Sequence, residues 1–214
     1  MKMDYIDISP TISETTAVFP GDRAFSRQLN LDFKTGGNLQ LSSIEGTVHL
    51  GAHVDAPCHY HPKGESIDSR SLDYYLGDCQ VIEVKILAGT RITENDIAFI
   101  DISAPRILFK TGSFPNPNKW NSDFNSLSPQ LIKYLHQKRV KLVGIDTPSI
   151  DPFDDKKLES HHEIFENNMA VLEGVVLNHV APGPYTLVAL PLKIKEGDAS
   201  PVRAILLKGR MNLV

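Results

Sequence analysis

The stretch H-L-G-A-H-V-D-A-P-C-H-Y, residues 49–60, carries the histidine and aspartate side chains that the fold of this chain has to accommodate. It opens a cluster of four histidines within 13 residues: His49, His53, His59 and His61. The whole chain has 8 histidines in 214 residues, so a window of this size would hold about 0.5 on average. Gly51 and Pro57 interrupt the stretch, and we therefore expect a tight loop or a short helix from His49 to Asp55.

The spacing of this cluster, H-x3-H-x-D-x3-H, is typical of a metal site. Imidazole nitrogens and a carboxylate suit Zn²⁺, with Mn²⁺ or Fe²⁺ as alternatives, and His49, His53 and Asp55 are the candidate ligands. A structural zinc site usually closes with four protein ligands, often cysteines, whereas only Cys58 is near. The pattern thus favours an open site over the alternative of surface or core histidines.

A second segment can complete such a site. His161 and His162 precede Glu173, which ends the apolar run 169–172. A carboxylate in that place is costly unless it meets a cation or a hydrogen-bond donor, so Glu173 is a further candidate ligand. The alternative is that Glu173 points to solvent as a strand-end residue.

Composition describes one soluble domain spanning residues 1–214. The chain has 22 Lys and Arg against 26 Asp and Glu, a net charge of −4, and no basic run, which argues against a nucleic-acid or membrane partner. Two cysteines, Cys58 and Cys79, make no disulfide framework. Without a recognisable secretory signal or an apolar run of roughly 20 residues, we expect a cytoplasmic protein.

Short β-branched runs alternate with a few helical stretches along the chain. We expect strands over residues 5–8, 25–33, 81–87, 107–109, 140–145, 169–173, 185–191 and 202–207, and a similar run from Leu39. Ser128-Pro129 starts a helix, Thr93 caps a short one, and residues 156–167 are expected to form another. Few helices among many strands predict an α/β domain that is not a doubly wound sheet.

With both segments in view, the chain resembles the bacterial kynurenine formamidases of the metal-dependent cyclase-like hydrolase family. The likeness spans almost the whole chain. It is carried by A-V-F-P-G-D (17–22), the histidine motif (49–60), S-H-H (160–162), V-L-E-G-V-V-L (171–177), A-L-P-L-K (189–193) and D-A-S-P-V-R-A-I-L (198–206). The histidine motif is typical of the broad family, and its combination with the tail is typical of the formamidase branch.

The resemblance implies a centre of two divalent metal ions, expected to be zinc. By position, His49 and His53 bind one ion, His161 binds the other, and both carboxylates, Asp55 and Glu173, contribute to both. The resemblance also implies that His59 transfers protons. It further implies a layered β/β/α fold of the swivelling type, a small-molecule substrate and a homodimer.

The implied reaction is hydrolysis of N-formyl-L-kynurenine to L-kynurenine and formate in tryptophan breakdown. Formamidases usually have Trp in the segment A-V-F-P-G-D where this chain has Phe19, so the aromatic substrate contact is kept in kind. Two alternatives stay open: a cyclase-family hydrolase acting on another aryl or cyclic amide, such as an isatin-type ring, and a non-catalytic metal or small-molecule binding protein. We expect the other four histidines to lie at the surface or behind the ligands, and Trp120 to serve as a lid or a dimer contact.

Overall fold

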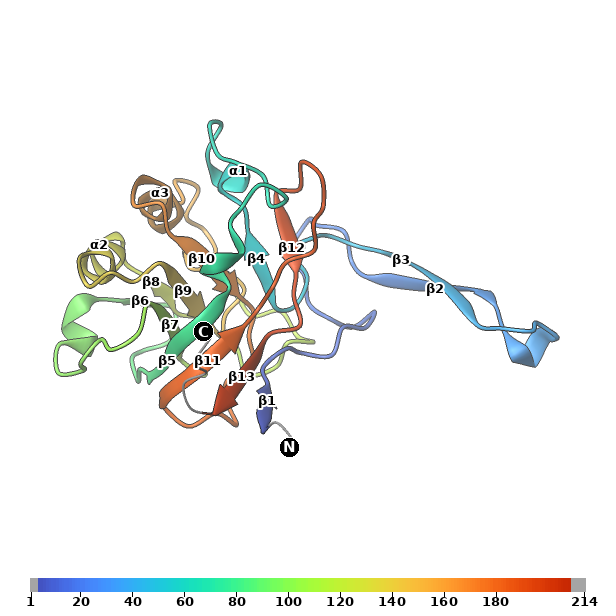
Figure 1. Cartoon of the computed structure of the whole chain (residues 1–214), viewed down its shortest axis with the longest axis horizontal. Coiled ribbons are helices and arrows are strands. Elements are labelled where there is room, and N and C mark those ends of the chain that lie inside the picture. Colours follow the sequence, from blue (N-terminus) through green and yellow to red (C-terminus); the bar gives the residue numbers. More distant parts are fainter. Residues whose placement is uncertain (1–3, 209–214) are drawn as a thin grey trace.

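One large sheet forms the frame of the molecule in the computed structural model, which describes residues 4–208. Its nine strands lie in the spatial order β1-β13-β11-β5-β7-β9-β10-β4-β12 (Figure 1). They are β1 (Tyr5–Asp7), β4 (His53–Asp55), β5 (Leu76–Glu83), β7 (Arg106–Lys110), β9 (Leu142–Ile145), β10 (Ala170–Glu173), β11 (Gly183–Val188), β12 (Ala199–Pro201) and β13 (Ile205–Lys208). The central strands β5, β7, β9 and β10 run parallel, and the outer pairs are antiparallel.

Few helices accompany this sheet. Within residues 4–208 the α-helices are α1 (Pro57–Tyr60), α2 (Pro129–Gln137) and α3 (Glu159–Glu166), and the 3₁₀ segments are η1 (Phe33–Thr35), η2 (Leu72–Tyr74) and η3 (Glu94–Ile97). Two small sheets pair β2 (Ser26–Leu31) with β3 (Leu41–Glu45) and β6 (Arg91–Ile92) with β8 (Ser126–Leu127). The expected strand-rich α/β fold is confirmed, and no helix in the described part is long and apolar enough to cross a membrane.

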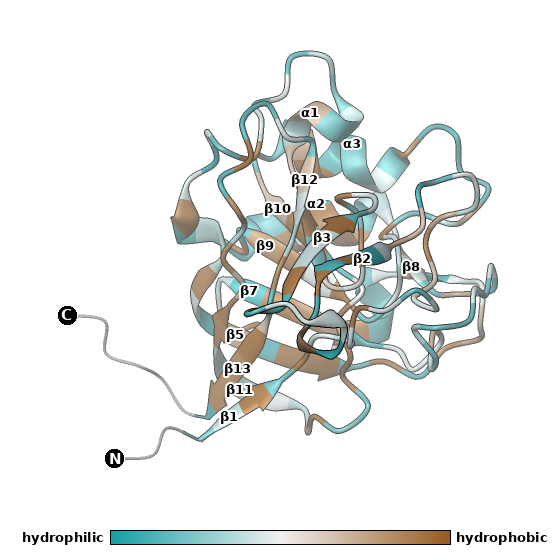
Figure 2. Cartoon of the chain, turned by 90° about the vertical axis from the view of Figure 1, so that its right-hand side faces the viewer, coloured by the Kyte–Doolittle hydropathy of each residue, from teal (hydrophilic) through white to brown (hydrophobic). Residues whose placement is uncertain are grey.

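Alternation along the strands gives the sheet a core on each face. On β7, Leu108 points into one buried cluster, while Ile107 and Phe109 point into the other. The second cluster also holds Leu131 of α2 and Ile164 of α3, so these two helices cover that face (Figure 1). Figure 2 shows hydrophobic residues concentrated in the strands of the sheet, as expected for strands packed on both faces.

The helices begin where capping chemistry allows. The Ser128 side chain accepts a hydrogen bond from Leu131 N at 3.1 Å, and Pro129 occupies the first turn, which confirms the expected start of α2. Thr93 and Asp96 form a capping box, but the segment behind them is the 3₁₀ helix η3. The helix expected over 156–167 begins only at Glu159, because Leu158 adopts left-handed backbone angles that a helix cannot contain.

The histidine motif was expected to form a loop or a short helix up to Asp55, and this is wrong for its second half. Residues 53–55 form strand β4, which pairs antiparallel with β10 on one side and β12 on the other. The two-residue period places His53 and Asp55 on one face and sends Val54 into the core. The strand expected over 202–207 begins only at Ile205, as β13, and the residues before the expected range, 199–201, form a separate strand, β12, beside β4.

One glycine allows two site-bearing segments to meet. Gly174 follows β10 with φ of +66°, and a Cβ atom there would lie 2.1 Å from the backbone oxygen of Gly51. A larger residue would push apart the turn before β4 and the end of β10. Across the same strand pair, Glu173 is directly opposite His53 in the antiparallel register.

The hairpin β2–β3 projects away from the body of the molecule (Figure 1). Every residue of both strands is exposed. Register pairs Arg27 with Ile44 and Leu29 with Ser42, which places Leu29 and Ile44 on one face of the ribbon. Ile44 is 74% exposed and Leu29 is 40% exposed, so none of the residues 4–208 buries these two apolar side chains, which share their face with Arg27 and Ser42.

Candidate metal centre

Five side chains from separate elements meet at one end of β4 and β10. The structure brings together His49 from the preceding turn, His53 and Asp55 from β4, His161 from α3 and Glu173 from β10. All of these except His49 are at most 3% exposed. The residues expected from sequence to hold metal therefore form one buried cluster.

Each carboxylate of the cluster divides its oxygens between the histidines. Asp55 Oδ1 lies 3.0 Å from His49 Nδ1 and 3.5 Å from His53 Nε2, whereas Asp55 Oδ2 lies 3.4 Å from His161 Nε2. Glu173 Oε2 lies 3.4 Å from His53 Nε2, and Glu173 Oε1 lies 3.4 Å from His161 Nε2. The cluster therefore has two sides: His49 and His53 lie on one side of the carboxylates, and His161 lies on the other.

Each of the three histidines is held from behind by an acceptor on its other ring nitrogen. His49 Nε2 lies 3.1 Å from Asp198 Oδ2, His53 Nδ1 lies 3.0 Å from the Gly51 carbonyl, and His161 Nδ1 lies 2.8 Å from Asp151 Oδ2. Metal-binding histidines commonly make this outer hydrogen bond, which fixes the tautomer and the ring orientation. The acceptors therefore leave His49 Nδ1, His53 Nε2 and His161 Nε2 facing the carboxylates.

Sequence reasoning did not single out Asp151 and Asp198. Asp198 stands in the tail motif that carries the family resemblance, and Asp151 ends D-T-P-S-I-D after the buried strand β9. The acidic residue directly after that strand is Asp146, and Asp151 lies further along the loop, so no local signal in the sequence points to Asp151. Only the fold brings either residue to a histidine, across 149 and 10 positions of sequence respectively.

Two atoms of the cluster show that it fits a cation. Asp55 Oδ1 and His161 Nε2 are buried and form ion-pair contacts within the cluster, but neither makes a hydrogen bond of good geometry among residues 4–208. Buried polar atoms nearly always make such bonds, so these two atoms mark a place for a ligand. Imidazoles and carboxylates suit divalent transition metals, and His53, Asp55 and Glu173 offer ligand atoms within 4.8 Å of one another, so the cluster fits such an ion.

Without metal, the cluster is an array of ion pairs. Burial opposes protonation of His49, but hydrogen bonds and charges from Asp55 and Asp198 outweigh it and raise its pKa to about 9. The same balance raises the pKa of His161, through Asp151, Asp55 and Glu173. Burial opposes ionisation of Asp55, yet His161 and His49 hold its pKa well below the ordinary value. The metal-free site thus carries protons that a cation would displace.

His59 differs from the other histidines of the site. It lies on the short helix α1, its side chain is 35% exposed, and its Nδ1 is 3.7 Å from Asp198 Oδ2, beyond hydrogen-bond range. Burial lowers the pKa of His59, more than the neighbouring Asp55 charge raises it. Its ring centroid lies 4.1 Å from that of His49, and its donor atoms lie close enough to His49 and Asp55 to share an ion with them.

A cavity of about 440 Å³ opens over the cluster. Its lining includes an aromatic wall of Phe19 and Phe153, the apolar residues Pro148 and Val176, and all five residues of the cluster. The Phe19 ring centroid lies 5.4 Å from that of Phe153 and 5.1 Å from that of Trp120, which packs edge-on against it. Phe19 is therefore at the cavity, where sequence placed it, and Trp120 supports it from within the same chain.

His61 and His179 lie outside the cluster. His61 stacks on Phe165 with ring centroids 3.7 Å apart, and His179 Nε2 lies 2.9 Å from the Asp7 carbonyl. Arg203 donates from Nε to Asp7 Oδ2 at 2.8 Å, which ties the tail to β1. These contacts are structural and do not involve the cavity.

Metal should reverse the pH dependence of stability. In the metal-free chain, the raised pKa of His49 stabilises the fold fully below about pH 6.5, and this contribution is lost as the pH rises to about 9. We expect Tm of the chelator-treated protein to fall by on the order of 5 °C across this range. Tm of the metal-loaded protein should rise instead, because protons compete less for the ligands. Calorimetry measures both.

The variant His49→Gln provides the control for this experiment. Without the raised pKa, the metal-free variant should show a flatter Tm between pH 6.5 and 9. Parallel pH trends in chelated and metal-loaded wild-type protein would contradict this account of the site.

Comparisons with known proteins agree with this arrangement. The family model for putative cyclases matches residues 6–152. A solved structure described as a potential metal-dependent hydrolase with cyclase activity is 28% identical, with a TM-score of 0.85, and the match covers 98% of this chain and 100% of that chain. A predicted metal-dependent hydrolase from Bacillus stearothermophilus is also 28% identical, with a TM-score of 0.82 and the same coverage.

The fold is shared more widely. Isatin hydrolase A from Labrenzia aggregata is 20% identical, with a TM-score of 0.81, and the match covers 96% of this chain and 93% of that chain. At this identity the likeness shows a common fold. Because the family model spans more than half of the sequence, the chain belongs to the putative cyclase family.

Proposed function

We propose that this protein is a metal-dependent amidohydrolase that converts N-formyl-L-kynurenine to L-kynurenine and formate. The observation that carries the proposal is that the five residues of the cluster line one cavity together with an aromatic wall of Phe19 and Phe153. An aryl ring packs against such a wall, while the amide reaches the cluster. The family membership supports a hydrolase, and the 28% identical relatives are described as metal-dependent hydrolases.

The proposed cofactors are two divalent ions, most simply zinc, one on each side of the cluster. His49 and His53 would hold the first and His161 the second, with Asp55 and Glu173 serving both. The division of carboxylate oxygens between His53 and His161 supports this assignment. Divalent ions held there supply Lewis-acid activation of an amide carbonyl and of water at neutral pH.

Side chains of the protein would orient the substrate and transfer the proton. Phe19 and Phe153 orient the aryl group and exclude water from one side of the amide. Water adds to the formyl carbon, the C–N bond breaks, and the leaving nitrogen needs a proton. His59 is suited to carry that proton, because burial lowers its pKa and leaves the ring neutral at neutral pH, able to take a proton from the attacking water and pass it to the nitrogen.

A second candidate substrate is a neutral cyclic aryl amide such as isatin, and one observation favours it. The side chains that line the cavity include Asp22, Asp146 and Asp155 but no Lys or Arg among the described residues. Formylkynurenine carries a carboxylate, and this cavity offers no fixed cation to pair with it, whereas isatin needs none. Structures of isatin hydrolases share the fold at 17% and 20% identity.

Parallel assays distinguish these substrates and test the function. Purified protein loaded with zinc should release formate from N-formylkynurenine, and activity should vanish with chelator and return with added metal. The parallel assay uses isatin as the substrate and measures its hydrolysis as a loss of absorbance. A kcat/KM at least 10-fold higher for isatin would reassign the substrate, and no turnover of either by metal-loaded protein would support the non-catalytic binding alternative.

The variant His59→Ala tests the proton-transfer role. Loss of a general acid lowers kcat by roughly 10²-fold or more, while metal content should stay unchanged. Elemental analysis of the same preparation gives the metal count. Near-full activity would remove His59 from the mechanism, and loss of an ion would make His59 a ligand instead.

We also propose that the protein is a homodimer in which two β2–β3 hairpins meet. A two-stranded ribbon is marginally stable alone, and the face with Leu29 and Ile44 projects where the chain's own body does not cover it. In a two-fold dimer the same face of each copy comes together, which buries apolar residues on both sides.

Light scattering after gel filtration tests this interface. Wild-type protein should elute as a dimer, and Ile44→Lys should shift it to monomer, because two buried charges would oppose each other. The control Leu87→Lys changes an 80% exposed residue elsewhere and should leave the dimer intact. A monomeric wild type, or a dimeric Ile44→Lys, would contradict this interface.

A further inference from the structure

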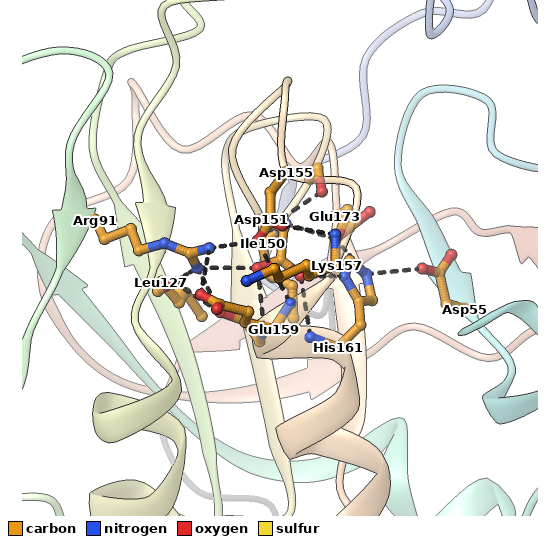
Figure 3. Close-up of polar contacts among 12 residues, drawn as sticks. Asp55, Arg91, Leu127, Ile150, Asp151, Asp155, Lys157, Glu159, His161 and Glu173 are labelled. Atoms are coloured by element: carbon orange, nitrogen blue, oxygen red, sulfur yellow. Dashed lines mark hydrogen bonds and ion pairs between the residues drawn. The ribbon is translucent and has the colours of Figure 1, made fainter. Parts of the chain in front are cut away.

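A partly exposed arginine, Arg91, lies directly behind the His161 side of the metal centre, with 22% of its side chain exposed. Arg91, on the short strand β6, directs Nη1 at three acceptors: Asp151 Oδ1 at 2.9 Å, Ser160 Oγ at 2.8 Å and the Leu127 carbonyl at 2.7 Å. Figure 3 shows Arg91 on one side of the segment with Asp151 and His161, and Asp55 on the other side. Arg91 touches neither the cavity nor a ligand of the centre.

Asp151 transmits this contact to the centre. Its side chain is fully buried, and Oδ2 accepts hydrogen bonds from His161 Nδ1 at 2.8 Å and from His161 N at 3.1 Å. Oδ1 accepts from Ser160 N at 2.9 Å as well as from Arg91. One carboxylate therefore caps the first turn of α3 and orients the imidazole that this turn carries.

The second arm of Arg91 reaches the cavity wall. Nη2 lies 2.5 Å from Asp155 Oδ2 and 3.5 Å from Glu159 Oε2. Asp155 lines the cavity, in the same segment as Phe153. The guanidinium thus joins the segment that forms the aromatic wall to the carboxylate that orients His161.

The positive charge of Arg91 stabilises the buried carboxylate of Asp151. A buried carboxylate without a cation is costly, and removing one partner of a buried pair leaves the other uncompensated. Asp151 has no other arginine or lysine within ion-pair distance in the described part of the chain. Without the guanidinium, Asp151 would keep its donors on Ser160 and His161 but lose the cation on Oδ1, and its hold on the His161 ring would weaken.

We propose that Arg91 is a positioning residue that sets the metal affinity of the His161 side of the centre and the placement of the aromatic wall. The proposal rests on the metal centre of the proposed function. It predicts an asymmetric effect, because the outer acceptors of His49 and His53 are Asp198 and the Gly51 carbonyl, which Arg91 does not contact. Loss of an outer partner such as Asp151 weakens metal binding by about 10 to 100-fold, and this range is the upper limit for loss of Arg91 behind it.

The test measures the number of zinc ions bound per chain on purified full-length protein, at a series of free zinc concentrations that chelator buffers set. Wild-type protein should lose its ions in two steps. Arg91→Met should weaken one step, by up to about 100-fold, and leave the other unchanged. Arg91→Lys should fall between them, because one ammonium keeps the charge but cannot reach Asp151 and Asp155 together. The Lys variant also serves if Arg91→Met fails to fold.

Arg106→Met is the matched control. Arg106 is buried, but its guanidinium donates to backbone carbonyls, including those of Tyr74 at 2.7 Å and Asp78 at 3.1 Å, away from the centre. This variant should lower Tm while both steps of zinc release stay as in wild type. Unchanged release in the Arg91 variants, or equal weakening of both steps, would overturn the proposal.

A substrate measurement separates this proposal from the function. In Arg91→Lys, KM for the accepted amide should rise, since the wall that holds Phe153 is loosened, and added zinc should restore kcat but not KM. If wild-type protein binds zinc but hydrolyses neither substrate, the two-step zinc release still decides the role of Arg91. Wild-type protein that binds no zinc would overturn both the metal centre and the role of Arg91.

Discussion

The burial of two carboxylates among three histidines is the interaction on which the rest of this structure depends. Asp55 and Glu173 are almost inaccessible to water, and such groups destabilise a fold unless cations or donors surround them. Here His49, His53 and His161 surround them, and each ring is fixed by an acceptor behind it. Within the cluster, Asp55 Oδ1 and His161 Nε2 lack a hydrogen bond of good geometry, and these atoms face the place that a divalent ion would fill.

The topology of the sheet follows from the need to assemble this cluster. Strand β4 lies beside β10, which places His53 opposite Glu173. The crossover that joins the parallel strands β9 and β10 contains α3, and this helix carries His161 to the same cluster. Gly174 lets the two strand ends approach closely. The same crossover contains the segment with Phe153, which explains why the aromatic wall and the second half of the centre are mechanically joined.

Sequence reasoning located the site well because its signals are local. Histidines crowded into 13 residues, and a glutamate ending an apolar run, are visible without a fold. What it missed depends on distant pairing. Strand β4 looked like a loop because three residues between a glycine and a proline carry little β signal, and it is extended only because β10 and β12 supply hydrogen bonds on both sides. The contact of Asp198 with His49 likewise exists only after folding.

The central claim is that Asp55 serves two ions at once. The most direct measurement is elemental analysis of metal per chain in wild-type protein and in Asp55→Asn, each prepared in excess zinc and then freed of unbound metal. The account predicts two ions per wild-type chain and a loss from both sides in the variant, because one oxygen of Asp55 faces His49 and His53 while the other faces His161. A variant that retains two ions, or a wild-type chain that binds one, would contradict it.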